Sequence, residues 1–173
     1  MPDIKFEIVK RIGIISSYSS KSLEFNIVKW NSNEEKYDVR KWEKSSPKKG
    51  IVFSYSELMT VYEILKNDRK TKKNSLIPIH VYKMDDSEAK IFSIVGKYKT
   101  VANGNMTGQI TYTSWTGKPK YDFRNWNSDY SACSKGITMS DNEVDIFIKL
   151  IESEFKNTSN DEYDTSEIDD LLI

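Results

Sequence analysis

The chain of 173 residues carries one sequence pattern twice, and this duplication constrains its fold more than any other feature. The first copy reads KYDVRKW at 36–42 and KGIVFS at 49–54. The second copy reads KYDFRNW at 120–126 and KGITMS at 135–140. Matching tryptophans are 84 residues apart and matching Lys-Gly pairs are 86 apart, so only small loop changes separate the copies. A repeat of this length predicts two related structural units in tandem.

The first unit is predicted to contain four strands and one helix. Apolar and polar residues alternate over 4–15, 23–30 and 36–42, as is typical of half-buried strands, and a short strand follows at 50–53. Ser56 is predicted to cap a helix with one apolar face. The expected order of elements is therefore ββββα.

The second unit repeats this order. Its predicted strands lie at 91–102, 109–115, 120–126 and 135–139. Ser140 or Asp141 is expected to cap the helix that follows. Between the units, the apolar segment 76–82 is either an extra edge strand or a packed linker, because Pro78 cannot donate to the ladder of a central strand.

These elements predict an α+β fold of two ββββα units packed as an intrachain pseudo-dimer. The expected boundaries are 1–66 for the first unit, 67–88 for a linker, 89–156 for the second unit and 157–173 for a disordered tail. A unit of roughly 60 residues buries little surface, so the two units are expected to share one core. The chain is accordingly expected to act as a monomer that is itself a pseudo-dimer, with higher oligomers left open.

The charge of the chain is divided unevenly. The segment 157–173 holds six acidic residues and no Lys or Arg. Subtracting it from the 26 basic and 26 acidic residues of the chain leaves 26 basic and 20 acidic ones, a charge of +6 over 1–156. A basic body with an acidic tail favours a protein that binds polyanions.

Composition and residue counts argue against several other classes of protein. No apolar run approaches the ~18 residues of a membrane helix, and the N-terminus lacks a secretory pattern, so a cytoplasmic location is expected. Cys133 is the only cysteine and His80 the only histidine, which argues against disulfides, metal clusters and histidine-based catalysis. No enzyme activity, metal or cofactor is expected.

The repeated strand places Asp, Arg and Trp at i, i+2 and i+4, and hence on one face of the sheet. Tyr37 and Val39 alternate with them and are expected to face the core. Trp42 and Trp126 are therefore predicted to be exposed on the other face, beside Arg40 and Arg124. An exposed ring next to a cation suits single-stranded nucleic acid, whose bases stack on aromatic side chains while Arg and Lys neutralise phosphates.

Further candidate contacts surround these motifs. They are two tryptophans and seven lysines: Trp30, Lys29, Lys36, Lys48 and Lys49 in the first unit, and Trp115, Lys118, Lys120 and Lys135 in the second. The alternative interpretation is structural, because a tryptophan at a strand end often packs under a loop and an Asp–Arg pair often forms a weak surface ion pair.

The combined pattern resembles the positive-cofactor-four (PC-four) family of transcriptional coactivators, most closely its short bacterial members. The resemblance rests on Trp, a turn, KYDΦRxW, a loop and KGI followed by a helix, over 28–65 and 113–152. It implies a strongly curved four-stranded antiparallel sheet followed by a helix. Members of this family are usually homodimers that bind single-stranded DNA across both sheets with little sequence preference.

Carried over by motif, the resemblance implies six binding residues: Arg40, Trp42, Lys49, Arg124, Trp126 and Lys135. This chain departs from the family by joining both units covalently. The loop at 43–48 is basic at its end, whereas the loop at 127–134 carries Tyr130 and no lysine, so the two halves are expected to bind unequally.

The tail suggests a second role. Its polar, acidic composition predicts disorder. It ends in two acidic residues and an apolar tip, namely Asp169, Asp170, Leu171, Leu172 and Ile173. This ending resembles the acidic tails of bacterial and phage single-stranded-DNA-binding proteins, which recruit replication and repair partners. A solubilising tail is the alternative.

The function expected from the sequence is single-stranded-DNA binding for replication, recombination or repair in a bacterium or phage. One alternative is a transcription cofactor that acts on melted promoter DNA. Another is a protein-interaction module without nucleic-acid binding. RNA also remains open as a ligand, because stacking and phosphate contacts do not distinguish the sugar.

Overall fold

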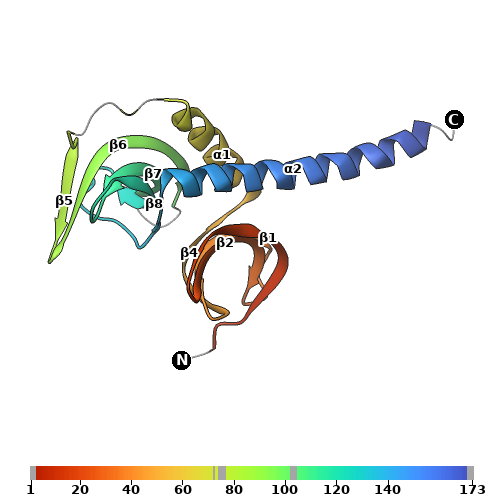
Figure 1. Cartoon of the computed structure of the whole chain (residues 1–173), viewed down its shortest axis with the longest axis horizontal. Helices are drawn as coiled ribbons and strands as arrows, with labels where there is room; N and C mark the ends of the chain where they lie inside the picture. Colours follow the sequence, from red (N-terminus) through yellow and green to blue (C-terminus); the bar gives the residue numbers. More distant parts are fainter. Residues whose placement is uncertain (1–2, 72, 74–76, 102–104, 171–173) are drawn as a thin grey trace.

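The protein is an α+β structure with two antiparallel sheets and two helices (Figure 1). The computed structural model describes residues 3–170 apart from 72, 74–76 and 102–104, with side chains up to residue 156. In Figure 1 the first sheet curls into an open ring and the second forms an arch. Helix α2 runs between the ring and helix α1, and its end projects away from both sheets.

The first sheet has the strand order β1-β2-β3-β4 and precedes α1. Its elements are β1 (Phe6–Tyr18), β2 (Lys21–Trp30), β3 (Lys36–Glu43), β4 (Ser46–Phe53) and α1 (Tyr55–Arg69). The four predicted strands are present. Strand β4 begins four residues earlier than expected, because positive φ angles at Lys44 and Ser45 close a tight two-residue hairpin between β3 and β4.

The second sheet has the order β5-β6-β7-β8-β9 and precedes α2. Its elements are β5 (His80–Met84), β6 (Ser87–Thr100), β7 (Met106–Ser114), β8 (Lys120–Asn127), β9 (Ile137–Met139) and α2 (Asp141–Asp170). Strand β5 adds a fifth strand at the edge of this sheet, so the segment expected as a linker at 67–88 contains the end of α1 and an edge strand. Pro78 precedes β5 and removes no hydrogen bond from the ladder.

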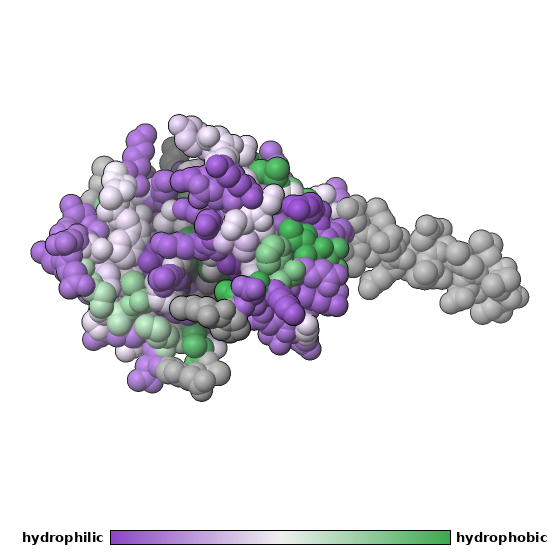
Figure 2. Space-filling model, turned by 90° about the horizontal axis from the view of Figure 1, so that it is seen from below, coloured by the Kyte–Doolittle hydropathy of each residue, from purple (hydrophilic) through white to green (hydrophobic). Residues whose placement is uncertain are grey.

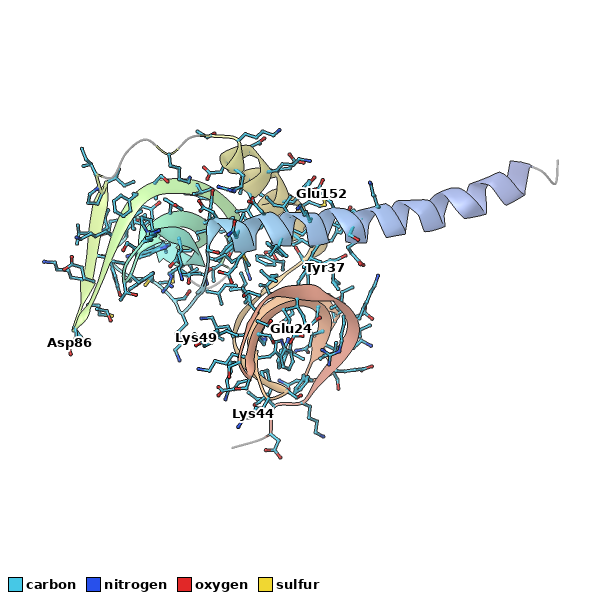
Figure 3. The ribbon with its side chains drawn as sticks, in the orientation of Figure 1. Glu24, Tyr37, Lys44, Lys49, Asp86 and Glu152 are labelled. Atoms are coloured by element: carbon cyan, nitrogen blue, oxygen red, sulfur yellow. The ribbon has the colours of Figure 1, made fainter. Side chains whose placement is uncertain are left out.

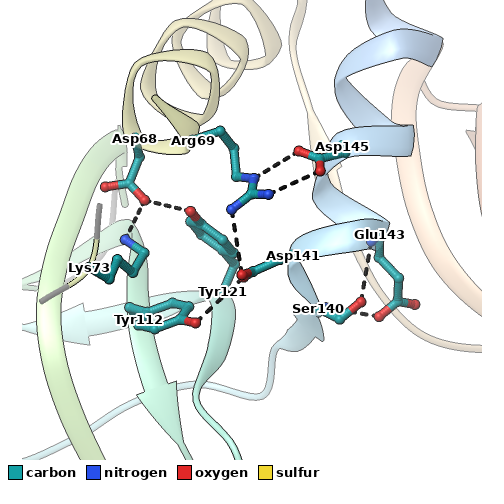
Figure 4. Close-up of polar contacts among 9 residues, drawn as sticks. All are labelled: Asp68, Arg69, Lys73, Tyr112, Tyr121, Ser140, Asp141, Glu143 and Asp145. Atoms are coloured by element: carbon teal, nitrogen blue, oxygen red, sulfur yellow. Dashed lines mark hydrogen bonds and ion pairs between the residues drawn. The ribbon is translucent and has the colours of Figure 1, made fainter. Parts of the chain in front are cut away.

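Both helices begin with a reciprocal cap. The Ser54 hydroxyl accepts from the Glu57 backbone N–H, and the Glu57 carboxylate accepts from the Ser54 N–H. Ser140 and Glu143 form the same pair of hydrogen bonds (Figure 4). The predicted cap at Ser56 is wrong, because the reciprocal bonds fix the start of α1 two residues earlier.

One apolar core joins the two sheets and both helices. Val39 and Phe25 of the first sheet and Phe123 of the second are buried in it, together with Phe147 of α2. The ring of Phe147 meets that of Phe25 edge-on at a centroid distance of 5.2 Å. The expectation of a shared core is therefore confirmed, and so is the assignment of the alternating residues to the core face.

Each helix packs on the long strand of the other sheet. Helix α2 contacts β1, where a side chain at Gly13 would collide with Leu150. Helix α1 contacts β6, where a side chain at Gly96 would collide with Ile64. The absence of a side chain at each glycine lets the helix approach the strand backbone closely. The pairing registers show that the two glycines occupy matching positions in the two sheets.

Polar contacts hold the helices together at the edge of this core (Figure 4). Arg69 of α1 donates two hydrogen bonds to the Asp145 carboxylate of α2, at 2.7 and 3.0 Å. These bonds hold the pKa of Asp145 below its usual value. The Tyr121 hydroxyl donates to Asp68 at 2.6 Å, which ties the end of α1 to β8.

Helix α2 continues through Asp170, so the backbone of 157–170 is helical where the sequence predicted disorder. No Gly or Pro stands between Asp141 and the C-terminus, and extending an existing helix costs far less than starting one. The backbone of Asp169 and Asp170 lies in this helix. The remaining tail residues, Leu171, Leu172 and Ile173, lie outside the described residues. Within the part of the chain that is described, neither helix is both long and apolar enough to span a bilayer.

Candidate nucleic-acid interface

The first copy of the repeated motif builds a Trp–Asp–Arg cluster on the sheet face opposite the core. The fully buried Asp38 carboxylate accepts a hydrogen bond from Trp30 Nε1 at 3.0 Å and another from Arg40 Nε at 3.1 Å. The Arg40 guanidinium also lies 4.4 Å from the centroid of the Trp30 ring. One carboxylate therefore orients both an indole and a guanidinium.

The second copy builds the same cluster. The buried Asp122 carboxylate accepts from Trp115 Nε1 at 2.6 Å and from Arg124 Nε. The Arg124 guanidinium again lies 4.4 Å from the tryptophan ring. Burial raises the pKa of the Asp122 carboxyl, and the donors on Arg124 and Trp115 oppose that rise. The charged carboxylate therefore depends on both donors.

The repeated glycine makes room for the arginine of this cluster. A side chain at Gly50 would lie 2.7 Å from Arg40, and one at Gly136 would collide with Arg124 and the Phe123 carbonyl oxygen. The guanidinium of Arg40 reaches across to donate to the Lys48 carbonyl oxygen at 2.8 Å. The recurring Lys-Gly pair therefore has a packing role.

The arginine side chains are mostly buried, at 16% exposure for Arg40 and 12% for Arg124. Their guanidinium groups already bind the buried carboxylates and backbone carbonyl oxygens. These contacts give both arginines a structural role and leave little of either group open to a phosphate.

The prediction that Trp42 and Trp126 are exposed is wrong. They lie on the face opposite the main core, as the alternation indicated, but their exposures are 5% and 0%. Phe6 covers Trp42 at a ring distance of 5.5 Å, and Tyr82 of β5 covers Trp126 at 5.3 Å. The curl of each sheet brings a covering ring over the tryptophan, so neither indole presents a stacking surface.

A basic groove spans the two sheets. Its volume is about 510 Å³, and its lining includes five lysines (Lys21, Lys41, Lys48, Lys49 and Lys120) against two glutamates (Glu43 and Glu143). The buried side chains of Leu23 and Trp42 also border it, and Tyr18, which is 84% exposed, is another lining residue. Figure 3 shows Lys49 between the ring of the first sheet and the second sheet. Seen from below, the molecule has mostly hydrophilic residues across its middle (Figure 2).

The groove gathers three of the lysines expected from the sequence, namely Lys48, Lys49 and Lys120. The other four lie outside it. Lys29 borders a separate shallow hollow, Lys36 lies 3.9 Å from Glu34, and Lys118 and Lys135 are exposed elsewhere. The half-buried Trp30 and Trp115 belong to the arginine clusters.

Among the groove residues that sequence reasoning missed are two lysines and one exposed aromatic residue. Lys41 lies inside the repeated motif, where the second copy has Asn125, so comparison of the copies could have singled it out. Lys21 and Tyr18 flank the turn between β1 and β2, and no local pattern distinguishes them from other turn residues.

Most of the groove's positive charge has no counterpart at the matching positions of the second sheet. The pairing registers and the repeated motif match its first-sheet lysines as follows: Lys21 with Met106, Lys41 with Asn125, Lys48 with Ser134 and Lys49 with Lys135. Three of the four positive charges are therefore lost in the second copy. The two halves therefore differ in charge at these positions, and unequal binding stays a prediction.

The single histidine and the single cysteine form no catalytic arrangement with the other described side chains. His80 Nε2 lies 3.1 Å from the Tyr130 carbonyl oxygen, and Cys133 is half-buried. A hydrogen bond with Cys133 raises the pKa of the Tyr82 hydroxyl. No group of three His, Cys, Asp or Glu side chains in the described part of the chain is placed to hold a metal ion.

Comparison with protein-family models and with curated proteins found no significant match to this chain.

Proposed function

We propose that this protein binds single-stranded DNA in the basic groove between its two sheets. The observation that carries the proposal is the convergence of five lysines, from β2, β3, β4 and β8, on one groove of about 510 Å³. Lysines along a groove neutralise successive phosphates without reading the bases. The exposed ring of Tyr18 in the groove lining supplies a stacking surface for an unpaired base.

We also infer that the two ββββα units form an intrachain pseudo-dimer of the PC-four kind, with β5 as an addition to the second unit. The duplicated Trp–Asp–Arg cluster and the reciprocal packing of each helix on the opposite sheet support this inference. We propose a role in replication, recombination or repair, processes that use largely sequence-independent binding of single strands. A transcription cofactor on melted promoter DNA would use the same groove.

Removing two groove charges is expected to weaken DNA binding. Each phosphate contact with a single strand contributes about 0.7 to the log–log salt slope, or roughly fivefold in affinity at 0.1 M salt. The double variant Lys41→Gln/Lys49→Gln should therefore bind an unstructured oligonucleotide roughly 25-fold more weakly, with a slope smaller by about 1.4. Fluorescence-anisotropy titrations at several salt concentrations measure both quantities.

The matched control is Lys70→Gln/Lys83→Gln, which removes two exposed charges outside the groove. It should leave affinity within about twofold of the parent, because long-range charge effects are screened beyond ~10 Å. Equal losses in the two double variants would assign binding to net charge and remove the groove from the proposal. Titrations with RNA and duplex DNA of equal length decide between the ligand classes.

We propose that the acidic end of α2 recruits replication or recombination proteins. Its helical backbone projects from the sheets and carries six acidic residues between 161 and 170 (Figure 1). Deleting residues 161–173 raises the net charge from 0 to +6 and is expected to preserve or tighten DNA affinity. Oligonucleotide titration measures this, and comparison of the proteins that co-purify with each form tests recruitment. A weaker DNA affinity after deletion would contradict the assignment.

A further inference from the structure

The curl of the first sheet encloses a hollow that is separate from the groove. Its volume is about 360 Å³. It is lined by Phe6, Ile8, Arg11, Ser20, Ser22, Glu24, Trp42, Lys44 and Ser45. Figure 3 shows Glu24 within the ring drawn by this sheet and Lys44 at its rim. Trp42 lines both the hollow and the groove, so the two spaces adjoin at this residue.

The second sheet holds an aromatic ring in the matching place. The ring of Tyr130 lies 5.7 Å from that of Trp126, and its hydroxyl donates to Gln109 Oε1 at 2.8 Å. Gln109 pairs with Arg124 across the sheet, as Glu24 pairs with Arg40. Trp126 and Gln109 therefore correspond to Trp42 and Glu24, two residues that line the hollow.

The lengths of the two loops explain why a side chain occupies the space beside the tryptophan in the second sheet but not in the first. In the second sheet, the segment between β8 and β9 is long enough to turn back, and it places Tyr130 over Trp126. In the first sheet, the hairpin between β3 and β4 has only Lys44 and Ser45 at its tip.

The covering rings are equivalent in the two sheets, so they do not account for the difference. Phe6 lies 5.5 Å from both Trp30 and Trp42. Tyr82 lies 5.8 Å from Trp115 and 5.3 Å from Trp126. What distinguishes the first sheet is a space where the second sheet holds a planar ring with a hydrogen-bond donor.

Glu24 places a hydrogen-bond acceptor on the wall of this space. Its carboxylate accepts from Ser22 Oγ at 2.6 Å, from Arg11 at 3.3 Å and from Asn26 at 3.4 Å. A carboxylate has about four acceptor sites, so one further donor can be accommodated. Gln109 occupies the matching position and accepts the hydroxyl of Tyr130. The hollow therefore offers ring-sized space and an acceptor on one wall.

We infer that the hollow of the first sheet binds one nucleobase of the bound strand, with the exocyclic amino group of the base donating to Glu24. The inference rests on the proposed function, because the strand in the groove delivers the base past Trp42. Cytosine presents a 4-amino donor, whereas thymine presents carbonyl oxygens on both sides of its ring N–H, and these repel a carboxylate. Amino-bearing bases are therefore preferred to thymine at this position.

The test compares an all-thymine octamer with octamers that carry one cytosine in place of one thymine. Hydrogen bonds to charged groups have free energies that correspond to about tenfold in affinity or more, so the best cytosine octamer should bind about tenfold more tightly. In Glu24→Gln the preference should fall to within about twofold, because an amide can donate to thymine or accept from cytosine. Glu24→Gln keeps the size of the side chain and an acceptor for Ser22, so its fold should be retained.

The indole N–H signals of protein labelled with ¹⁵N-tryptophan provide a second readout. Addition of deoxycytidine monophosphate should shift the Trp42 signal and leave that of Trp126 in place, because Tyr130 already fills the second site. Equal affinities for all octamers together with an unshifted Trp42 signal would overturn the proposed base site. The proposal that the groove binds single-stranded DNA would be unaffected. Failure of every octamer to bind would instead overturn the proposed function.

Discussion

Replacement of Trp126 by alanine is expected to lower the free energy of unfolding by about 3–5 kcal/mol, the usual cost of removing a large aromatic ring from a buried site. The Trp126 ring is fully buried and packs against Tyr82 and Tyr130. Its loss would leave the edge strand β5 and the loop before β9 without their common contact. Urea unfolding followed by circular dichroism measures the change.

Two companion variants separate stability from DNA binding. Tyr18→Ala removes an 84% exposed ring and should change stability by less than about 0.5 kcal/mol. Trp126→Phe keeps an aromatic ring in the buried site and should bind DNA with unchanged affinity, because the Trp126 ring is not exposed. A folded Trp126→Phe protein with much weaker DNA binding would restore the stacking role expected from the sequence.

Replacement of Arg124 by methionine is expected to cost about 3–5 kcal/mol at neutral pH, because it leaves the buried Asp122 carboxylate without its cation. Burial already raises the pKa of Asp122, and Arg124 opposes that rise. Without Arg124 the folded-state pKa rises further above the value in the unfolded chain. The folded protein then binds a proton that the unfolded chain does not, so stability should recover as pH falls through the folded-state pKa.

Urea titrations of Arg124→Met between pH 4 and 8 test this sign. The double variant Arg124→Met/Asp122→Asn provides the control, because it removes the buried charge and should lose the recovery at low pH. Arg11→Met, at a 69% exposed side chain, should change stability little. If Arg124→Met instead unfolded more readily as pH fell, the carboxylate would not be the source of the penalty.

Several features of the fold were predictable because they depend on neighbouring residues. Val39 and Phe123 lie in the core, as their alternation in the sequence indicated. Ser140 caps α2 because its partner Glu143 is three residues away. In contrast, β5 was only one of two interpretations of its segment, since its hydrogen bonds depend on β6.

The candidate site was less predictable. The alternation put Asp38, Arg40 and Trp42 on one face, and they share it. Their exposure could not be predicted, because it depends on how far the sheet curls and on Phe6, which lies on another strand. The groove likewise joins lysines from four strands, and Lys120 comes from the other unit.

The sequence by itself determined that this protein contains two related units, which residues of each strand share a face, and where the unequal loops lie. These properties follow from chain connectivity and from the two-residue period of a strand. Only the tertiary structure decided that the face carrying Trp42 and Trp126 is covered, that a basic groove forms between the two sheets, and that a hollow forms on the first sheet. The physical reason is that solvent exposure is a property of what packs over a face, and the covering residues come from distant parts of the chain.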